Sequence, residues 1–241
     1  MNAKNLFVVG WVVTAIAAAF LIYEYYTLMP YFFIVGLAGA AFVGLWRANR
    51  MKTRDLVVLV LVSIFVAFID EYAHTSSGVL VYFDLNTPSL LTVMGWSLFL
   101  LVILSVTEYL SRTPVMKQLA RFDQPVVKTL PALIAIFATV VLVWAQGYLG
   151  VFDALLTGVY VSLGLVSLYY SQLRTLGWNL SILISSVAIG GAMEFLGGLD
   201  GMWWYFYLEP MAWFMVFTWA LRTWTIFTLC SFVGVKFKEV L

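Results

Sequence analysis

Long apolar runs dominate this sequence and limit what it can fold into. A helix that crosses the hydrocarbon core of a bilayer needs about 20 mostly apolar residues. Hydrophobic residues make up 63% of the chain and charged residues only 10%, which excludes a soluble globular protein of ordinary composition. We therefore predict an all-α polytopic membrane protein with eight transmembrane helices. The predicted spans lie near residues 6–24, 30–47, 55–73, 89–110, 130–148, 151–172, 178–196 and 210–233.

One motif occurs twice, at an offset of 123 residues, first from Glu71 to Trp96 and again from Glu194 to Trp219. Each copy has a carboxylate at the predicted outer end of a helix, a glycine seven residues later, a Tyr-Phe pair and a tryptophan. The same shift carries the first four predicted helices onto the last four, which indicates two parallel tandem four-helix repeats. The matched pairs are Glu71 and Glu194, Gly78 and Gly201, Tyr82 and Tyr205, Phe83 and Phe206, and Trp96 and Trp219.

The repeat also divides the chain. We assign residues 1–110 to the first four-helix repeat, 111–129 to a basic cytoplasmic linker and 130–241 to the second repeat. The linker contains two prolines and four basic residues, and we expect a short amphipathic helix between Val115 and Phe122 at the inner membrane surface.

Charge is distributed unevenly between the predicted loops. With eight spans, all of the 13 lysines and arginines except Arg222 fall on one side of the membrane. The positive-inside rule makes that side cytoplasmic, which predicts a multi-pass protein of the cell (plasma) membrane with both termini inside. The opposite side receives acidic residues at or near helix ends, among them Asp70, Glu71, Glu194 and Asp200.

Glu71 and Glu194 are the candidate catalytic residues. An acidic side chain in or near hydrocarbon tends to be protonated, paired or directed into a polar cavity. A carboxyl group that keeps its proton can act as a general acid near neutral pH. The neighbouring rings of Tyr82, Trp203, Trp204 and Tyr205 could stabilise a cation, although aromatic residues at this depth are also typical of the interfacial belt.

The remaining candidates for substrate binding are Trp96, Trp219, Arg222, Asp70 and Asp200. Arg222 lies about midway along the last predicted helix, where a charge usually faces an interior partner or a cavity. An ion pair with Glu194 or another outer carboxylate and a role in substrate handling are both open. His74 follows Glu71 in a Glu-x-x-His pair that occurs only once, so we predict no metal site.

At this motif the sequence resembles the membrane-embedded carotenoid end-group enzymes. The second copy is similar to the Glu-x-x-Gly-x-x-x-Gly pattern, aromatic loop, proline and tryptophan of the carotenoid hydratase family. It is more distantly similar to small lycopene cyclase domains, which pair a helix-end acid with a Trp-x-Tyr turn. The matching residues are Glu194, Gly197, Gly201, Trp203, Tyr205, Pro210 and Trp219.

The resemblance implies redox-neutral acid chemistry on a polyene, as hydration or cyclisation, with no cofactor. Glu194 would be the acid, Glu71 a second acid or a water-orienting base, and the aromatic rings the cation lining. The expected partners are a lipid-soluble polyene or another lipid and the membrane, with no nucleic acid and with a homo-oligomer left open. The competing interpretations are a small-molecule transporter or channel built from two parallel repeats and a membrane assembly protein.

Overall fold

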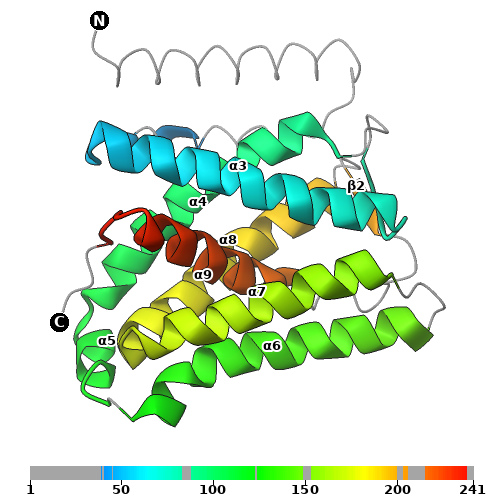
Figure 1. Ribbon diagram of the computed structural model, residues 1–241. Helices are drawn as coiled ribbons and strands as arrows, with labels where there is room; N and C mark the ends of the chain where they lie inside the picture. Colours follow the sequence, from blue (N-terminus) through cyan, green and yellow to red (C-terminus); the bar gives the residue numbers. More distant parts are fainter. Residues whose placement is uncertain are drawn as a thin grey trace, which may run out of the picture.

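Long helices lying side by side form most of the protein (Figure 1). The computed structural model describes residues 39, 41–44, 46–82, 88–122, 124–148, 153–199, 203–205 and 215–237. Two three-residue strands, which the all-α prediction did not include, pair at one end of the bundle. The elements are α3 (Thr53–Ser76), β1 (Leu80–Tyr82), α4 (Leu90–Ser111), α5 (Pro114–Leu119), α6 (Pro125–Tyr148), α7 (Ala154–Gln172), α8 (Leu176–Leu199), β2 (Trp203–Tyr205) and α9 (Met215–Phe232).

The protein is a polytopic membrane protein, but the described residues contain five helices that are long and apolar enough to cross a bilayer, rather than the eight predicted. Of the other three predicted spans, 6–24 lies outside the described residues and 30–47 mostly does. The third, 210–233, corresponds to α9. The five candidate spans are Thr53–Ser76, Thr92–Ser111, Pro125–Gly147, Ala154–Gln172 and Leu176–Phe195.

Helix α9 is helical as expected, but it is not among these five candidate spans, and it lies in the centre of the bundle. It packs against α3, α6, α7 and α8, and nearly all of its side chains from Met215 to Cys230 are buried. A helix surrounded by protein rather than lipid can carry polar groups, provided that they find partners. In α9 these polar groups are Arg222 and the threonines Thr218, Thr223, Thr225 and Thr228.

The sequence repeat has a counterpart in the geometry. A shift of 123 residues places α3 on α8 from end to end and α4 on α9. The packing of α4 against α8 is matched by that of α3 against α9. Strands β1 and β2 pair antiparallel, with Leu80 opposite Tyr205, Val81 opposite Trp204 and Tyr82 opposite Trp203. This register is symmetric about the central pair, as a two-fold axis between the repeats would require.

Gly78 makes the connection from α3 to β1 possible. Its φ of 72° lies in the left-handed region that residues with a Cβ rarely adopt, and it follows Ser77 at the end of α3. The chain therefore reverses within a few residues. The reversal brings Tyr82 back over the last turns of α3, where Glu71 lies.

Basic side chains and helix α5 lie at the end of the bundle opposite the ribbon (Figure 1). Arg47 donates from both terminal nitrogens to the carboxylate of Glu108 at 2.8 and 2.6 Å, and Arg54 donates to the carbonyl of Val233 at 2.7 Å. Helix α5 overlaps the predicted segment 115–122 but begins one residue earlier, and α6 already begins at Pro125, inside the predicted linker. The linker is thus mostly helical.

Candidate functional site

Glu71 is enclosed by donors from its own repeat. The Tyr82 hydroxyl donates to Oε2 of Glu71, and Nε1 of Trp96 donates to Oε1 at 2.9 Å. Glu71 is only 5% exposed. The tight turn at Gly78 supplies the tyrosine, and the start of α4 supplies the tryptophan.

Glu194 has the same environment in the second repeat. The Tyr205 hydroxyl donates to Oε2 of Glu194 at 2.6 Å, and Nε1 of Trp219 donates to Oε1 at 2.9 Å. The Glu194 side chain is 11% exposed. The residues that recur in the sequence at one spacing therefore recur as one hydrogen-bonded unit, in which a carboxyl group accepts from a phenol and an indole.

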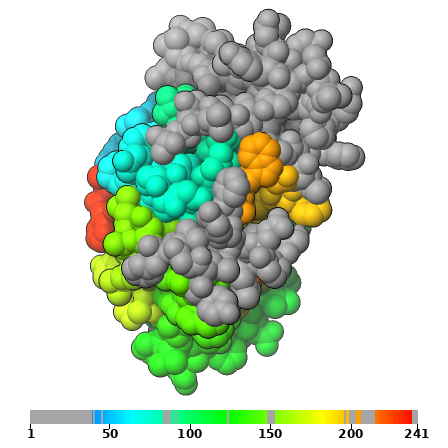
Figure 2. Space-filling model, turned by 90° about the vertical axis from the view of Figure 1, so that its right-hand side faces the viewer, coloured from blue at the N-terminus to red at the C-terminus, as the bar shows by residue number. Residues whose placement is uncertain are grey.

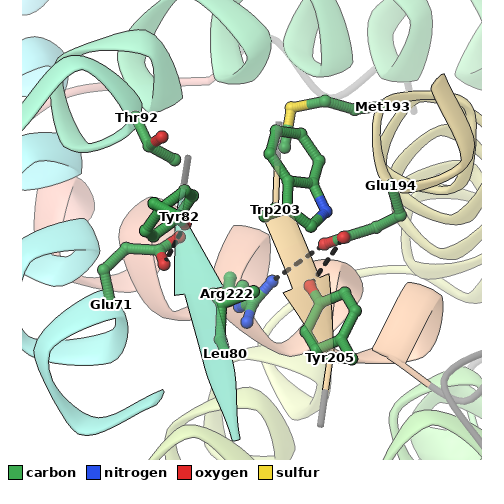
Figure 3. A pocket seen from close by; sticks show the side chains of 9 residues that line it. All are labelled: Glu71, Leu80, Tyr82, Thr92, Met193, Glu194, Trp203, Tyr205 and Arg222. Atoms are coloured by element: carbon green, nitrogen blue, oxygen red, sulfur yellow. Dashed lines mark hydrogen bonds and ion pairs between the residues drawn. The ribbon is translucent and has the colours of Figure 1, made fainter. Parts of the chain in front are cut away.

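Both glutamates lie on the wall of a single pocket beneath the ribbon formed by β1 and β2 (Figure 3). The pocket is small, with room for about one water molecule. Arg222 lies between the two glutamates in this view. The lining residues are Glu71, Leu80, Tyr82, Thr92, Met193, Glu194, Trp203, Tyr205 and Arg222.

Most of the predicted aromatic residues are buried around this pocket instead of forming an interfacial belt. The rings of Trp96 and Trp219 lie 4.8 Å apart between centroids, and Tyr82 meets Trp203 edge-on at 6.1 Å. The indole of Trp203 covers Gly197 so closely that a Cβ there would come within 2.0 Å of the ring. Of these four rings, those of Tyr82 and Trp203 line the pocket itself.

Trp204 differs from its neighbours because successive side chains of a strand point to opposite sides. It is 48% exposed and is not among the residues that line the pocket. Figure 2, which views the end of the molecule that carries the ribbon, shows β2 in orange at the surface. A position in the interfacial belt suits Trp204 better.

Arg222 forms the ion pair that its mid-helix position suggested, with Asp70 as its closest partner. Its Nη2 lies 2.8 Å from Oδ2 of Asp70, and its Nη1 lies 4.0 Å from Oε1 of Glu194. The guanidinium also lies 4.9 and 5.1 Å from the ring centroids of Trp96 and Trp219. Asp70, which has no acidic counterpart in the second repeat, thus holds the cation in place.

Sequence reasoning missed a buried polar chain that continues from Asp70. Nδ1 of His74 donates to the Asp70 carbonyl oxygen at 2.7 Å and lies 3.3 Å from Oδ2 of the same residue. Its Nε2 lies 2.7 Å from the hydroxyl of Tyr160 on α7, and that hydroxyl lies 3.5 Å from Sδ of Met215. Every member is at most 3% exposed.

The signal for this chain was present in the sequence as a set of departures from the repeat. The counterparts of Asp70, His74, Arg222 and Tyr160 are the nonpolar residues Met193, Gly197, Phe99 and Leu37. A duplicated structure needs no such differences for its own stability. Residues that break the repeat therefore indicate where the two halves have come to differ.

The two phenols that bind the glutamates remain neutral over the physiological range. Burial raises the pKa of Tyr82 well above its usual value, and Glu71 adds to this rise when it is ionised. Burial and Glu194 raise the pKa of Tyr205 in the same way. Both tyrosines therefore remain hydrogen-bond donors.

Two predictions need a separate statement. Asp200 lies outside the described residues, and so does the rest of the loop before β2. Within the described part of the chain, no three His, Cys, Asp or Glu side chains converge as a metal site. Comparison of the chain with models of known protein families, with curated proteins and with solved structures finds no match.

Proposed function

We propose that this protein is an integral membrane enzyme that performs redox-neutral acid chemistry, hydration or cyclisation, on a polyene end group. The observation that carries the proposal is the pair of buried carboxyl groups on the wall of one small pocket surrounded by aromatic rings. Acid and base groups that face the same enclosed space are the parts that such a reaction needs.

The reaction balances with these groups alone. One glutamic acid donates its proton to the terminal C=C bond, which leaves a tertiary carbocation on the adjacent carbon. In hydration, water forms the new C–O bond and loses a proton to the other carboxylate. In cyclisation, an internal C=C bond forms the new C–C bond, and the carboxylate removes a proton from the ring. Neither route changes the oxidation state of the protein.

The aromatic rings supply the means to stabilise the cation. A cation in contact with a ring face gains about 2 kcal/mol when water is excluded, and Tyr82, Trp203 and Tyr205 line the pocket. The pocket has room for about one water molecule, which suits the reactant of a hydration. An end group would enter after a shift of the ribbon or of the Trp203 indole.

The basic end of the molecule suggests its orientation in the membrane. Arg54 lies at the start of α3, Arg112 follows the end of α4 and Lys117 lies on α5, and these helix ends are at the side of the bundle away from the ribbon (Figure 1). Following the positive-inside rule, we place α5 in the cytoplasm and the pocket toward the outer face of a cell membrane.

Pigment analysis tests the enzyme proposal. The wild-type chain and the variants Glu71→Gln and Glu194→Gln are expressed in a bacterium that makes an acyclic polyene, and the extracted pigments are separated and weighed by mass spectrometry. We expect the wild type to add the mass of one water, or to form a ring without a change of mass, and both variants to lose this activity. Asp153→Asn, which alters only the cap of α7, is the control and should remain active.

A well-folded wild-type protein that leaves a panel of acyclic polyenes unchanged would refute the proposal. Activity that persists in both glutamine variants would also refute it. Uptake of a solute by vesicles containing the protein would then favour the transporter.

A further inference from the structure

The two glutamates have matched hydrogen bonds but unmatched charges around them. Tyrosine and tryptophan donors recur in both repeats, whereas Asp70, His74, Tyr160 and Arg222 belong to one half each. We infer that this asymmetric cluster gives the two glutamates different roles. Glu71 holds the proton that is donated, and Glu194 is the carboxylate that accepts a proton. This inference rests on the proposed function for its catalytic meaning.

A count of charges indicates that one carboxyl group keeps a proton. Three carboxyl groups, Asp70, Glu71 and Glu194, lie around one guanidinium, and His74 can add at most one more positive charge. If all three carboxyl groups were ionised, their negative charge would exceed the positive charge of Arg222 and a protonated His74 together. An uncompensated charge in a water-poor interior costs several kcal/mol, so protonation of one carboxyl group is the favoured solution.

The ion pairs identify which carboxyl group this is. Arg222 contacts Asp70 at 2.8 Å and lies 4.0 Å from Glu194. Within the described ranges Glu71 forms no ion pair with a basic side chain, and its chain neighbour is the carboxylate of Asp70. Positive charge stabilises the ionised form of the group that it faces, and a neighbouring negative charge stabilises the protonated form. The proton therefore belongs on Glu71.

The other groups that face Glu71 are compatible with this state. The titratable and charged neighbours come from α3, α7, α8, α9 and both strands, and the phenols among them stay neutral. A protonated Glu71 can keep both observed hydrogen bonds, because each oxygen of a carboxylic acid retains a lone pair that can accept, Oε2 from Tyr82 and Oε1 from Trp96. These neighbours are Asp70, His74, Tyr82, Tyr160, Glu194, Tyr205 and Arg222.

His74 and Tyr160 act as positioning residues. His74 is held by Tyr160 on one side and by the Asp70 carbonyl on the other, and it lies against the Asp70 carboxylate. This arrangement keeps Asp70 directed at Arg222. Arg222 forms its ion pairs with Asp70, at 2.8 Å, and with Glu194, at 4.0 Å.

The catalytic cycle follows from this assignment. Glu71 gives its proton to the C=C bond and becomes a carboxylate. Glu194 then takes the proton that water, or the closing ring, releases. Transfer of that proton from Glu194 back to Glu71 across the pocket restores the starting state, so the sum of the steps is addition of water or isomerisation.

Infrared spectroscopy of the purified protein tests the division without any substrate. A protonated carboxyl group has its own C=O stretching band, which shifts in D₂O. We expect this band in the wild type at neutral pH, its loss in Glu71→Gln and its retention in Glu194→Gln. Asp70→Asn should also remove the band, because it frees Arg222 to pair with Glu71. The amide bands of the same spectra report whether each variant is folded.

Substitution of the two tyrosines provides a second pair of variants, which leaves both carboxyl groups in place. Tyr82→Phe should shift the band, since it removes a hydrogen-bond partner of the protonated group, and Tyr205→Phe should leave the band in place. A band that is lost in Glu194→Gln and kept in Glu71→Gln would overturn the inference, as would the absence of a band in the wild type. The infrared experiment uses no polyene. It can therefore contradict the assignment of the proton to Glu71 independently of whether the proposed reaction occurs.

Discussion

Arg222 illustrates how one side chain can make two similar halves unequal. It stands where the first repeat has Phe99, and it is only 3% exposed. A buried cation is tolerated because Asp70 lies 2.8 Å away and two indole rings flank the guanidinium. Removing one member of such a pair leaves the other member buried with its charge uncompensated.

Replacement of Arg222 should therefore destabilise the protein strongly. Arg222→Leu strands the Asp70 carboxylate, and we expect a loss of about 3–5 kcal/mol in the free energy of unfolding. The double variant Asp70→Asn with Arg222→Leu should recover much of that loss, because neither charge remains. Denaturant unfolding in detergent measures both values, and a double variant as unstable as the single one would contradict the ion-pair explanation.

The glycines at the end of α8 provide a matched steric comparison. A Cβ at Gly197 would come within 2.0 Å of the Trp203 ring, whereas nothing lies within 4 Å of a Cβ at Gly198. We expect Gly197→Ala to cost about 1–3 kcal/mol through overpacking. Gly198→Ala should be neutral or should stabilise α8 by up to about 1 kcal/mol. Equal thermal midpoints for the two variants would show that Trp203 does not occupy the place described.

Among the elements, the short ribbon positions the two tyrosines that donate hydrogen bonds to the glutamates. Its strands come from different repeats and pair in a register that is symmetric about Val81 and Trp204. Each strand also contributes a ring or an aliphatic side chain to the pocket. Isolated two-stranded ribbons are marginally stable, so hydrogen bonds to Glu71 and Glu194 from the helices below stabilise this one.

The raised pKa values of the ribbon tyrosines predict a pH dependence of stability. The folded protein holds these phenolic protons more tightly than the unfolded chain, which loses them near pH 10. Their contribution is complete below about pH 10 and is lost as the pH rises further, by up to about 1.4 kcal/mol per pH unit for each tyrosine. The double variant Tyr82→Phe with Tyr205→Phe should show a shallower alkaline decline in unfolding free energy. An unchanged slope would contradict the burial of these groups.

At the scale of the whole molecule, the described parts of the two repeats pack against each other. Helix α4 packs on α8, α3 packs on α9, and the site needs residues from both halves. The ribbon lies at one end of the bundle and α5 at the other (Figure 1). Orientation in the membrane thus decides which compartment the pocket faces.

Cysteine labelling checks this orientation. Cys230 is the only cysteine and is fully buried, so the background should be low. In intact cells, a membrane-impermeant maleimide should label Trp204→Cys near the ribbon. It should label Gln118→Cys on α5 only after the cells are opened. The reverse pattern would place the pocket on the cytoplasmic side.

The sequence predicted those features that depend on local composition and on the repeat. It indicated apolar helices, the helix in the linker, and the two units of glutamate, tyrosine and tryptophan, because spacing along the chain limits which side chains can meet. It did not predict the ribbon, since three-residue strands have no periodicity of their own. In the described residues it did not distinguish α9 from the five candidate spans, because apolar length alone cannot tell a helix surrounded by protein from one surrounded by lipid.

Contacts between distant helices decided the rest. Asp70 on α3, Tyr160 on α7 and Arg222 on α9 are far apart in the chain, and their meeting depends on how three helices pack. The sequence alone determined that two acids of one kind exist in equivalent places. Only the tertiary structure decided which of them lies beside the cation, because a charge acts through space rather than along the chain.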